Sequence, residues 1–274
     1  MKTLPGRMRI FATPGSPTVA MSATATEKEI SSMVSNLGLR NAPVILKASP
    51  IQNHIKFVTL QRPSNNCGSF GRMDKEGKDH PGLVALLKRI YLDTFISNTR
   101  LGLPSAKCII FFRTESHMFD VNDFIGSELP HLKGSREMPY VMNHGGLGPI
   151  TSQDLIDRRN EITLFLSTSK MLMGIDIENI DVVIFVRVLG MLHYIVQGAG
   201  RGGRRSVQYL GMRRRVVVYI LYNSSDVAAN VPGLAVEVRE FCKTKECLKK
   251  FLGNYFDKDA HHQATDWCCG NCNV

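Results

Sequence analysis

The sequence predicts an α/β fold with a mostly parallel sheet. Short apolar or β-branched runs recur along the chain, and segments with helical character separate them. Strands that alternate with helices are typical of βαβ units, whose strands lie parallel. Apolar residues make up 43% of the 274 residues, which is enough to build a sizeable core.

The first part of the chain alternates strand and helix signals. Pro17–Met21 is a short apolar run that predicts a strand, and the polar segment Glu27–Leu37 predicts a helix. Ile55–Leu60 alternates as a half-buried strand does. A charged loop rich in Gly, Ser, Asn and Lys follows over Gln61–His80, and Pro81–Leu92 is expected to be a helix because proline suits a first turn.

The second part continues this alternation and then changes character. The β-branched and aromatic run Ala106–Phe112 predicts a buried strand, and Asp120–Leu129 is expected to be a helix. The remaining strands are expected at Tyr140–Met142, Ile162–Leu166, Asp181–Val188 and Arg215–Leu221. After Asn223 the strand signal ends and Ala228–Tyr255 has helical periodicity, so we place a domain boundary near residue 225.

Charge and cysteine usage narrow the class of protein. The net charge of +10 suits a partner made of phosphates, although many basic proteins bind none. No apolar run approaches the roughly 20 residues of a membrane span, and Met1–Gly15 lacks the apolar region of a secretory signal. We therefore expect an intracellular protein without a membrane partner. Five of the seven cysteines fall within Cys242–Cys272, which favours a metal site over disulfides.

The strongest chemical signal is QGAGRGGR, from Gln197 to Arg204. Arg201 and Arg204 stand three apart in a glycine-rich turn before an expected strand, so both can reach one anion. An alternative is an RGG-like turn that touches RNA loosely, but such segments are usually long and repetitive. In motor ATPases, an arginine so placed stabilises the charge that develops on the γ-phosphate.

This run resembles motif VI of superfamily 2 helicases, in the form that RecQ enzymes use. Further segments fall in that family's order: Ser22–Thr24 resembles motif III, Ile109–Arg113 motif IV, His144–Leu147 the HAGL element and Ser167–Asp176 motif V. Each segment alone could be an ordinary turn or cap, with Thr24 or Thr26 as the N-cap of a helix. Together, in order and at family spacing, they identify the chain as a superfamily 2 member.

The resemblance implies a role for each matched position. Arg201 and Arg204 would be arginine fingers facing ATP between two lobes, and Gln197 would hold them or contact the nucleotide. The nucleotide-side residues that it implies are Gln197, Gly200, Gly174 and Asp176. The implied contacts to the DNA backbone are Thr24, Arg113, Thr114, His144, Gly145 and Thr168. Such contacts ignore base sequence, as a translocating motor requires.

A second group of residues resembles the zinc-binding module that follows the RecQ motor. Cys247 opens CLKKFLGNYF, and Cys269 and Cys272 form CGNC. Thiolates in a tetrahedral set suit Zn²⁺, which takes four ligands. The family pattern places a further cysteine about three residues after the last one, and the candidate fourth ligands here are Cys242, Cys268, His261 and His262. The alternative is that these are free cysteines in a frayed tail.

Two elements of a complete motor do not occur in this sequence. It contains neither G-x-x-x-x-G-K-[ST] nor a DExH box, the elements that hold the phosphates and Mg²⁺. In the family they lie on the first lobe, upstream of motif III. We therefore expect the tail of a first RecA-like lobe over 1–40, a second RecA-like lobe over 41–225 and a helical, partial zinc-binding module over 226–274.

The function implied is ATP-dependent 3′–5′ DNA unwinding in recombination, repair and replication, in the nucleus of a eukaryote or otherwise the cytoplasm. ATP and Mg²⁺ would bind only with a first lobe present in cis, so we expect little or no ATPase activity from this chain alone. One rival is a non-catalytic nucleic-acid-binding remnant. Another is a fragment of an RNA-directed superfamily 2 motor. The basic cluster Arg204, Arg205 and 213–215 would face DNA or simply solvent.

Overall fold

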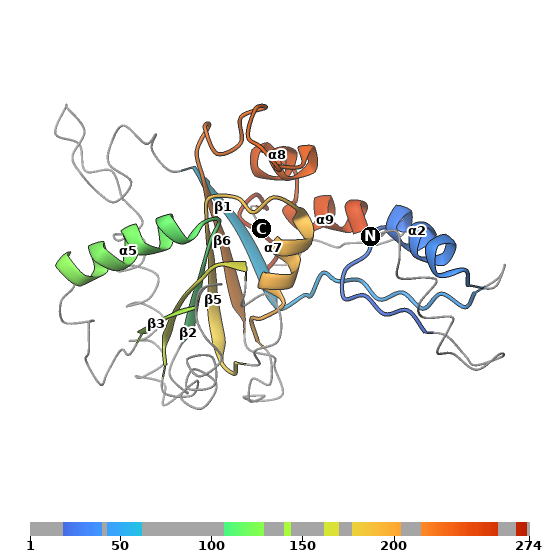
Figure 1. Cartoon of the computed structure of the whole chain (residues 1–274), viewed down its shortest axis with the longest axis horizontal. Coiled ribbons are helices and arrows are strands. Elements are labelled where there is room, and N and C mark those ends of the chain that lie inside the picture. Colours follow the sequence, from blue (N-terminus) through green and yellow to red (C-terminus); the bar gives the residue numbers. More distant parts are fainter. Residues whose placement is uncertain are drawn as a thin grey trace.

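The computed structural model describes residues 19–39, 43–61, 107–128, 140–143, 162–169, 177–203, 215–256 and 267–272. Its centre is a six-stranded sheet with the order β1-β6-β5-β2-β4-β3 (Figure 1). The strands are β1 Ile55–Gln61, β2 Lys107–Phe112, β3 Tyr140–Asn143, β4 Leu164–Ser167, β5 Ile180–Val186 and β6 Val216–Tyr222. Every neighbouring pair in this sheet is parallel, which confirms the predicted fold class.

The middle of the sheet is buried on both faces. All residues of β2 and β5 are buried, as expected for central parallel strands covered by helices on either side. In the register between them Phe111 lies opposite Phe185, and the two rings stack with centroids 5.2 Å apart. The uninterrupted apolar runs in the sequence are therefore explained by burial of both faces of these strands. A strand with one exposed face would instead alternate apolar and polar residues.

Helices cover the two faces of the sheet. Helix α5 (Glu115–Glu128) lies on one side, and helices α7 (Leu192–Ala199), α8 (Val236–Lys243) and α9 (Leu248–Phe256) lie on the other (Figure 1). The core is correspondingly split into two clusters of buried side chains, the larger beneath α7, α8 and α9. None of the described helices is long and apolar enough to span a membrane.

Helix α2 (Glu27–Leu37) has the predicted bounds because both of its ends are capped. The Thr26 hydroxyl accepts a hydrogen bond from the Glu29 backbone at 3.3 Å, and the Glu29 carboxylate accepts one from Thr26 N at 2.8 Å. This capping box makes Thr26, and not Thr24, the N-cap. At the other end Gly38 has a φ of 58°, a left-handed conformation that suits glycine.

Two local predictions were wrong. Helix α5 begins at Glu115 and not at Asp120, because the Thr114 hydroxyl accepts a hydrogen bond from His117 N at 3.5 Å and starts the helix earlier. Residues 19–21, the described part of the expected first strand, form no regular structure, and Val19 and Met21 are exposed. No described strand pairs with this segment, and an unpaired strand is not stable in water.

The C-terminal helices pack on the edge of the sheet. Phe241 of α8 meets Phe57 of β1 edge to face, with centroids 6.4 Å apart. Beyond α9, Gly270 N donates a hydrogen bond to Phe57 O at 2.8 Å, and Cys269 forms a parallel bridge with Phe57. The end of the chain is thus attached to the first strand of the sheet. The predicted loop 61–80 lies almost wholly, and the predicted helix 81–92 entirely, outside the described residues.

Candidate nucleotide-facing turn and cysteine cluster

The arginine-bearing turn follows α7 directly. Gln197 lies in the last turn of α7, and the backbone of residues 200–203 leaves the helix toward the start of β6. Four backbone hydrogen bonds hold this turn: Gly200 N to Val196 O at 2.9 Å, Arg201 N to Gly198 O at 3.0 Å, Gly202 N to Ala199 O at 2.9 Å, and Gly203 N to Ile180 O at 3.0 Å. The last of them ties the turn to the first residue of β5.

The glycines of the turn are required by close contacts. A Cβ on Gly202 would lie 2.4 Å from Cγ1 of Val216, and one on Gly203 would lie 2.7 Å from Nε2 of His54. Gly203 also has a φ of 66°. The run of glycines in the sequence therefore lets the turn press against β6 and the start of β1. Arg201 between them is buried at 7% exposure, and Arg204 lies outside the described residues.

Two side-chain contacts join the N-terminal segment to α7. Gln197 Nε2 donates a hydrogen bond to the Thr24 hydroxyl at 3.2 Å, and Thr24 is 8% exposed. One helical turn earlier, His193 Nε2 lies 2.8 Å from the Glu29 carboxylate, which also caps α2. The segments that resemble motif III and motif VI are therefore in contact. The Thr24 hydroxyl, which was predicted to contact DNA, accepts a hydrogen bond from Gln197.

The other predicted DNA contacts lie at the carboxyl ends of the strands. Arg113 follows β2 and donates a hydrogen bond to Pro232 O, and Thr114 caps α5. Thr168 follows β4, and its N–H donates to Asn143 O at 3.2 Å. In open parallel sheets this edge is where ligands bind. His144, Gly145, Gly174 and Asp176 lie outside the described residues.

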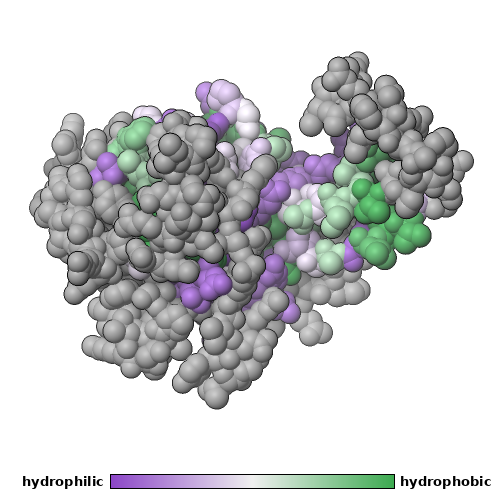
Figure 2. Space-filling model, turned by 60° about the horizontal axis from the view of Figure 1, so that its bottom comes forward, coloured by the Kyte–Doolittle hydropathy of each residue, from purple (hydrophilic) through white to green (hydrophobic). Residues whose placement is uncertain are grey.

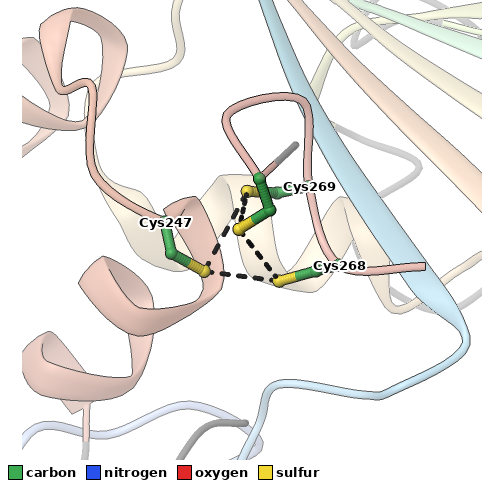
Figure 3. A group of neighbouring side chains, drawn as sticks. Cys247, Cys268 and Cys269 are labelled. Atoms are coloured by element: carbon green, nitrogen blue, oxygen red, sulfur yellow. Dashed lines mark hydrogen bonds between the residues drawn. The ribbon is translucent and has the colours of Figure 1, made fainter. Parts of the chain in front are cut away.

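Four cysteines form a cluster beside β1. Cys247 lies just before α9 and points toward Cys268 and Cys269 on the following loop (Figure 3). The Sγ atoms of these three and Cys272 all lie within 4.8 Å of one another. The Sγ–Sγ distance is 3.3 Å from Cys247 to Cys268 and 3.4 Å from Cys269 to Cys272. Among the described residues Cys268 is thus the fourth member of the cluster, and Cys242 lies elsewhere in the core. The other two candidates, His261 and His262, lie outside the described residues.

The separations fit a tetrahedral metal site. Zinc–thiolate bonds of about 2.3 Å place ligand sulfurs roughly 3.8 Å apart along each tetrahedral edge. With Cys247–Cys269 at 4.0 Å and Cys268–Cys272 at 3.6 Å, these four sulfur pairs span 3.3 to 4.0 Å. That range brackets the tetrahedral value and greatly exceeds a disulfide bond of about 2.05 Å. The four potential ligand atoms are all sulfurs, and a tetrahedral set of sulfurs suits Zn²⁺, whereas Mg²⁺ and Ca²⁺ take oxygen ligands.

Backbone N–H groups donate hydrogen bonds to two of the sulfurs. Leu248 N donates to Sγ of Cys269 at 3.3 Å, and Lys250 N donates to Sγ of Cys247 at 3.5 Å. Burial alone would raise the pKa of Cys269, but the backbone N–H groups of Leu248, Asn271 and Cys272 and the Cys272 thiol lower it on balance. Burial and the adjacent thiol of Cys247 raise the pKa of Cys268 to about 11. A cation at the centre would favour all four thiolates.

A buried cation stands beside the cluster. Lys249 is 1% exposed, and its Nζ donates hydrogen bonds to Asn53 O at 3.1 Å and to Trp267 O at 3.3 Å. Burial lowers its pKa, while the four cysteine thiols oppose that change. Four thiolates around Zn²⁺ carry a net charge of −2, so an ammonium group nearby compensates part of the charge.

Comparison with known proteins decides what the arginine-bearing turn belongs to. Residues 88–206, which include the turn, match the family described as the helicase conserved C-terminal domain. Over these residues the chain is similar to the C-terminal lobe of superfamily 2 helicases. The ATP-dependent DNA helicase RecQ of Bacillus subtilis (strain 168) is 28% identical over 141 residues, which are 47% of this chain and 23% of that protein.

Solved structures of low sequence identity show the same RecA-like fold. S. cerevisiae Dbp5 bound to RNA and ADP BeF3 is similar with a TM-score of 0.59 at 17% identity, over 90% of this chain and 52% of that chain. A variant of the same protein has a TM-score of 0.50 at 16% identity, over 80% of this chain and 48% of that chain. The chain thus spans about a quarter of the RecQ relative and about half of Dbp5.

Several residues that shape this helicase lobe had no signal in the sequence. His54 and Trp267 border the turn and the cysteine cluster, and Lys249 joins them. The sequence shows that Lys249 follows Cys247 by two positions, but only the tertiary structure shows that Lys249 is buried. The His193–Glu29 contact joins segments far apart in sequence, so neither residue stands out locally.

Proposed function

We propose that the chain is the second motor lobe of a RecQ-type DNA helicase, and that its arginine-bearing turn completes an ATP site formed with a first lobe. The observation that carries this proposal is the hydrogen bond from Gln197 to Thr24. It joins the segment that resembles motif III to the helix that leads into Arg201. A motor that couples hydrolysis to strand separation needs such a connection between its lobes.

Arg201 acts as the charge-stabilising group in this proposal. Its guanidinium presents a fixed fork of donors that matches phosphate oxygens, and its position in a turn held by backbone hydrogen bonds limits reorganisation. When bound, Mg-ATP supplies the reactive γ-phosphoryl group, and a first lobe supplies the lysine and carboxylates that hold it. Arg204, Gln197, Gly200, Gly174 and Asp176 are proposed to line the same site.

The cysteine cluster favours RecQ over other branches of the superfamily. Cys247, Cys268, Cys269 and Cys272 would hold Zn²⁺, which supplies a structural cross-link between α9 and the C-terminal loop. The cluster follows the last strand of the sheet in sequence, as the RecQ module follows its motor, and Cys269 pairs with Phe57 of β1. The sequence similarity to the B. subtilis RecQ helicase points the same way.

The carboxyl ends of β2 and β4 are the proposed DNA track. Arg113, Thr114 and Thr168 lie there, and the net charge of +10 favours binding to a phosphate backbone. His144 and Gly145 are proposed to belong to the same track. Binding through the backbone would make the affinity independent of base sequence and strongly dependent on salt.

An exposed apolar surface marks where the first lobe would pack. Figure 2 shows hydrophobic residues gathered on the surface at one end of the molecule, where α2 lies in Figure 1. The exposed hydrophobic residues of the segments beside α2 are Val19, Met21, Val44, Ile45 and Leu46. Contiguous apolar surface of this kind usually lies in an interface. These residues lie before and after the segment that resembles motif III, so the remainder of a first RecA-like lobe would pack against them.

The test is a comparison of this chain with a two-lobed protein in which a first RecA-like lobe precedes it. We expect no ATPase activity from the chain alone. The two-lobed protein should hydrolyse ATP faster when single-stranded DNA is added and should unwind duplexes that carry a 3′ overhang. Stimulation by RNA and not by DNA would support an RNA-directed motor, and DNA binding without hydrolysis would indicate a non-catalytic remnant. Either result would overturn the proposal.

A further inference from the structure

His54 lies between the arginine-bearing turn and the cysteine cluster. It directly precedes β1 and is 9% exposed. Its carbonyl oxygen accepts two hydrogen bonds, from Val216 N at 2.9 Å and from Trp267 Nε1 at 2.9 Å. Trp267 is the single tryptophan of the chain and directly precedes Cys268. The backbone of His54 is therefore fixed from β6 on one side and from the cysteine loop on the other.

The imidazole ring of His54 supports the turn. Its Nε2 lies 3.5 Å from Gly202 O, a long contact that contributes little as a hydrogen bond. Packing is the stronger argument, because a Cβ on Gly203 would lie 2.7 Å from Nε2 and 2.8 Å from Cδ2 of the ring. The ring thus lies directly against the backbone on the C-terminal side of Arg201. Removing it would leave a void beside the turn.

The cysteine loop holds Trp267 by several contacts. The Lys249 ammonium donates to Trp267 O and to Asn53 O, so it joins the loop to the residue before His54. Two further cations lie over the indole ring, Arg215 with Cζ 4.9 Å and Lys56 with Nζ 5.4 Å from the centroid. The indole N–H that donates to His54 thus belongs to a residue that directly adjoins the cysteine cluster.

We infer that His54 is a positioning residue through which the folded cysteine loop holds the arginine-bearing turn. Binding of a metal ion by the four cysteines would order Trp267, and Trp267 would fix His54, whose ring would restrain residues 201–203. The significance of this restraint for ATP hydrolysis rests on the proposed function, but the restraint itself is a property of this chain. Because coupling free energies are reciprocal, occupancy of the turn would also tighten the metal site.

Hydrogen exchange of the turn amides tests the inference without any activity measurement. The chain is prepared with one equivalent of Zn²⁺ and, separately, after chelation, and exchange is followed by mass spectrometry in peptides that cover 200–203. In the native chain we expect Zn²⁺ to slow exchange there by roughly three- to tenfold, the effect of one net hydrogen bond on local opening. Amides of β2 and β4, which lie on the other side of β5 from β6 and β1 in the strand order, serve as the internal reference.

Three variants test the successive contacts one at a time. His54→Ala keeps the carbonyl that accepts from Trp267 but removes the ring, so it should bind Zn²⁺ with unchanged stoichiometry while losing the protection of 200–203. His54→Gln restores a side chain with an N–H donor beside Gly202 O and should recover part of that protection. Trp267→Phe keeps an aromatic ring but removes the N–H donor, so it should raise exchange at the turn in the form of the chain whose cysteine loop, residues 267–272, is folded.

A matched control distinguishes local support from general destabilisation. Val121→Ala removes buried methyl groups from the other core cluster, beneath α5, and should leave the exchange ratio between metal-bound and chelated protein unchanged at the turn. Equal metal protection of 200–203 in native and His54→Ala chains would overturn the inference. If the chain binds no Zn²⁺, unchanged turn exchange in Trp267→Phe would overturn it, and increased exchange would support it. Neither result depends on ATP hydrolysis by a two-lobed protein.

Discussion

The Gln197 side-chain amide donates a hydrogen bond to the Thr24 hydroxyl at 3.2 Å, so the first described segment of the chain is joined to the helix that leads into the arginine-bearing turn. The two residues are 173 positions apart. Both are sheltered from solvent, which raises the cost of leaving either group without a partner. A movement of α7 would therefore displace the segment around Thr24, and a movement of that segment would displace α7.

Replacing either partner of this contact should destabilise the chain through the same interaction. We expect Gln197→Ala and Thr24→Val each to lower the free energy of unfolding by about 1 kcal/mol, and the double variant to lower it by less than the sum. Urea unfolding of the four proteins measures the coupling. Asn36→Ala removes an exposed hydrogen bond within α2 and is the control for which no such coupling with Gln197 is expected. Strict additivity of Gln197→Ala and Thr24→Val would contradict the contact.

Arg201 should be sensitive to shape as well as charge. In a two-lobed protein we expect Arg201→Ala to lower kcat for ATP hydrolysis by about 10³-fold, with a much smaller change in KM. Arg201→Lys keeps the charge but loses the fork of donors, so it should recover only a small part of the rate. Steady-state hydrolysis with saturating DNA is the measurement. Full activity in Arg201→Lys would show that the residue contributes charge alone.

Cys268 should be a metal ligand, whereas Cys242 should not. The sulfur of Cys268 lies 3.3 Å from that of Cys247, while Cys242 is buried in the core and burial raises its pKa to about 12. We expect one Zn²⁺ per native chain by mass spectrometry, and a large loss of affinity in Cys268→Ser. Cys242→Ser is the matched control and should retain the metal. Retention in Cys268→Ser would assign the fourth position to another group.

The Glu29 carboxylate should stabilise the fold in a pH-dependent way. Burial alone would raise its pKa, but the Thr26 N–H and the His193 ring lower it on balance. A lowered folded-state pKa means that the stabilisation is fully present above the unfolded value of about 4.3 and is lost as the pH falls through the folded value. The side chain is 48% exposed, so solvent screening limits the effect to at most about 1 kcal/mol.

Glu29→Gln tests this sign. The difference in unfolding free energy between the native chain and Glu29→Gln should be largest near neutral pH and should shrink as the pH is lowered from 5 to 3. His193→Gln keeps an N–H donor for the carboxylate but cannot carry a charge, so it should show a smaller dependence over the same range. A difference that grows on acidification would contradict the lowered pKa.

Gly190 should not tolerate any side chain. A Cβ at this position would lie 2.5 Å from Gly233 O, a backbone atom that cannot rotate away. We expect Gly190→Ala to cost about 1–3 kcal/mol in urea unfolding, the range of an overpacked core. Gly233→Ala is the control, because its added methyl meets nothing within 4 Å and only the φ of 68° opposes it. A cost of about 1 kcal/mol or less is expected there.

The sequence predicted most of the sheet because parallel strands report their burial locally. β2 and β5 are continuous apolar runs, and their bounds in the structure differ from the predicted ones by only one or two residues. Glycine-rich QGAGRGGR likewise predicted a close turn, since only small residues permit such contacts. Helix α5 begins before the predicted Asp120, because Thr114 accepts a hydrogen bond from His117 N and so caps the helix upstream of that residue.

Contacts between distant segments could not be predicted in this way. Cys268 was one of four candidates for the fourth ligand, and only the path of the loop beside β1 places its sulfur next to that of Cys247. Burial of Lys249 between Asn53 and Trp267 depends on the same path. No local pattern of hydrophobicity or charge carries such information, because the partners are more than 15 positions apart.

The bridge between Phe57 and Cys269 has a consequence for synthesis on the ribosome. β1 is the outermost strand on its side of the described sheet, and its other neighbour, β6, is made more than 150 residues later. The emerging chain must therefore keep this strand unpaired until β6 has been translated. A bare strand edge is a template for aggregation. A ribosome that stalls before β6 would therefore release a chain in which the hydrogen-bonding groups of β1 have no neighbouring strand.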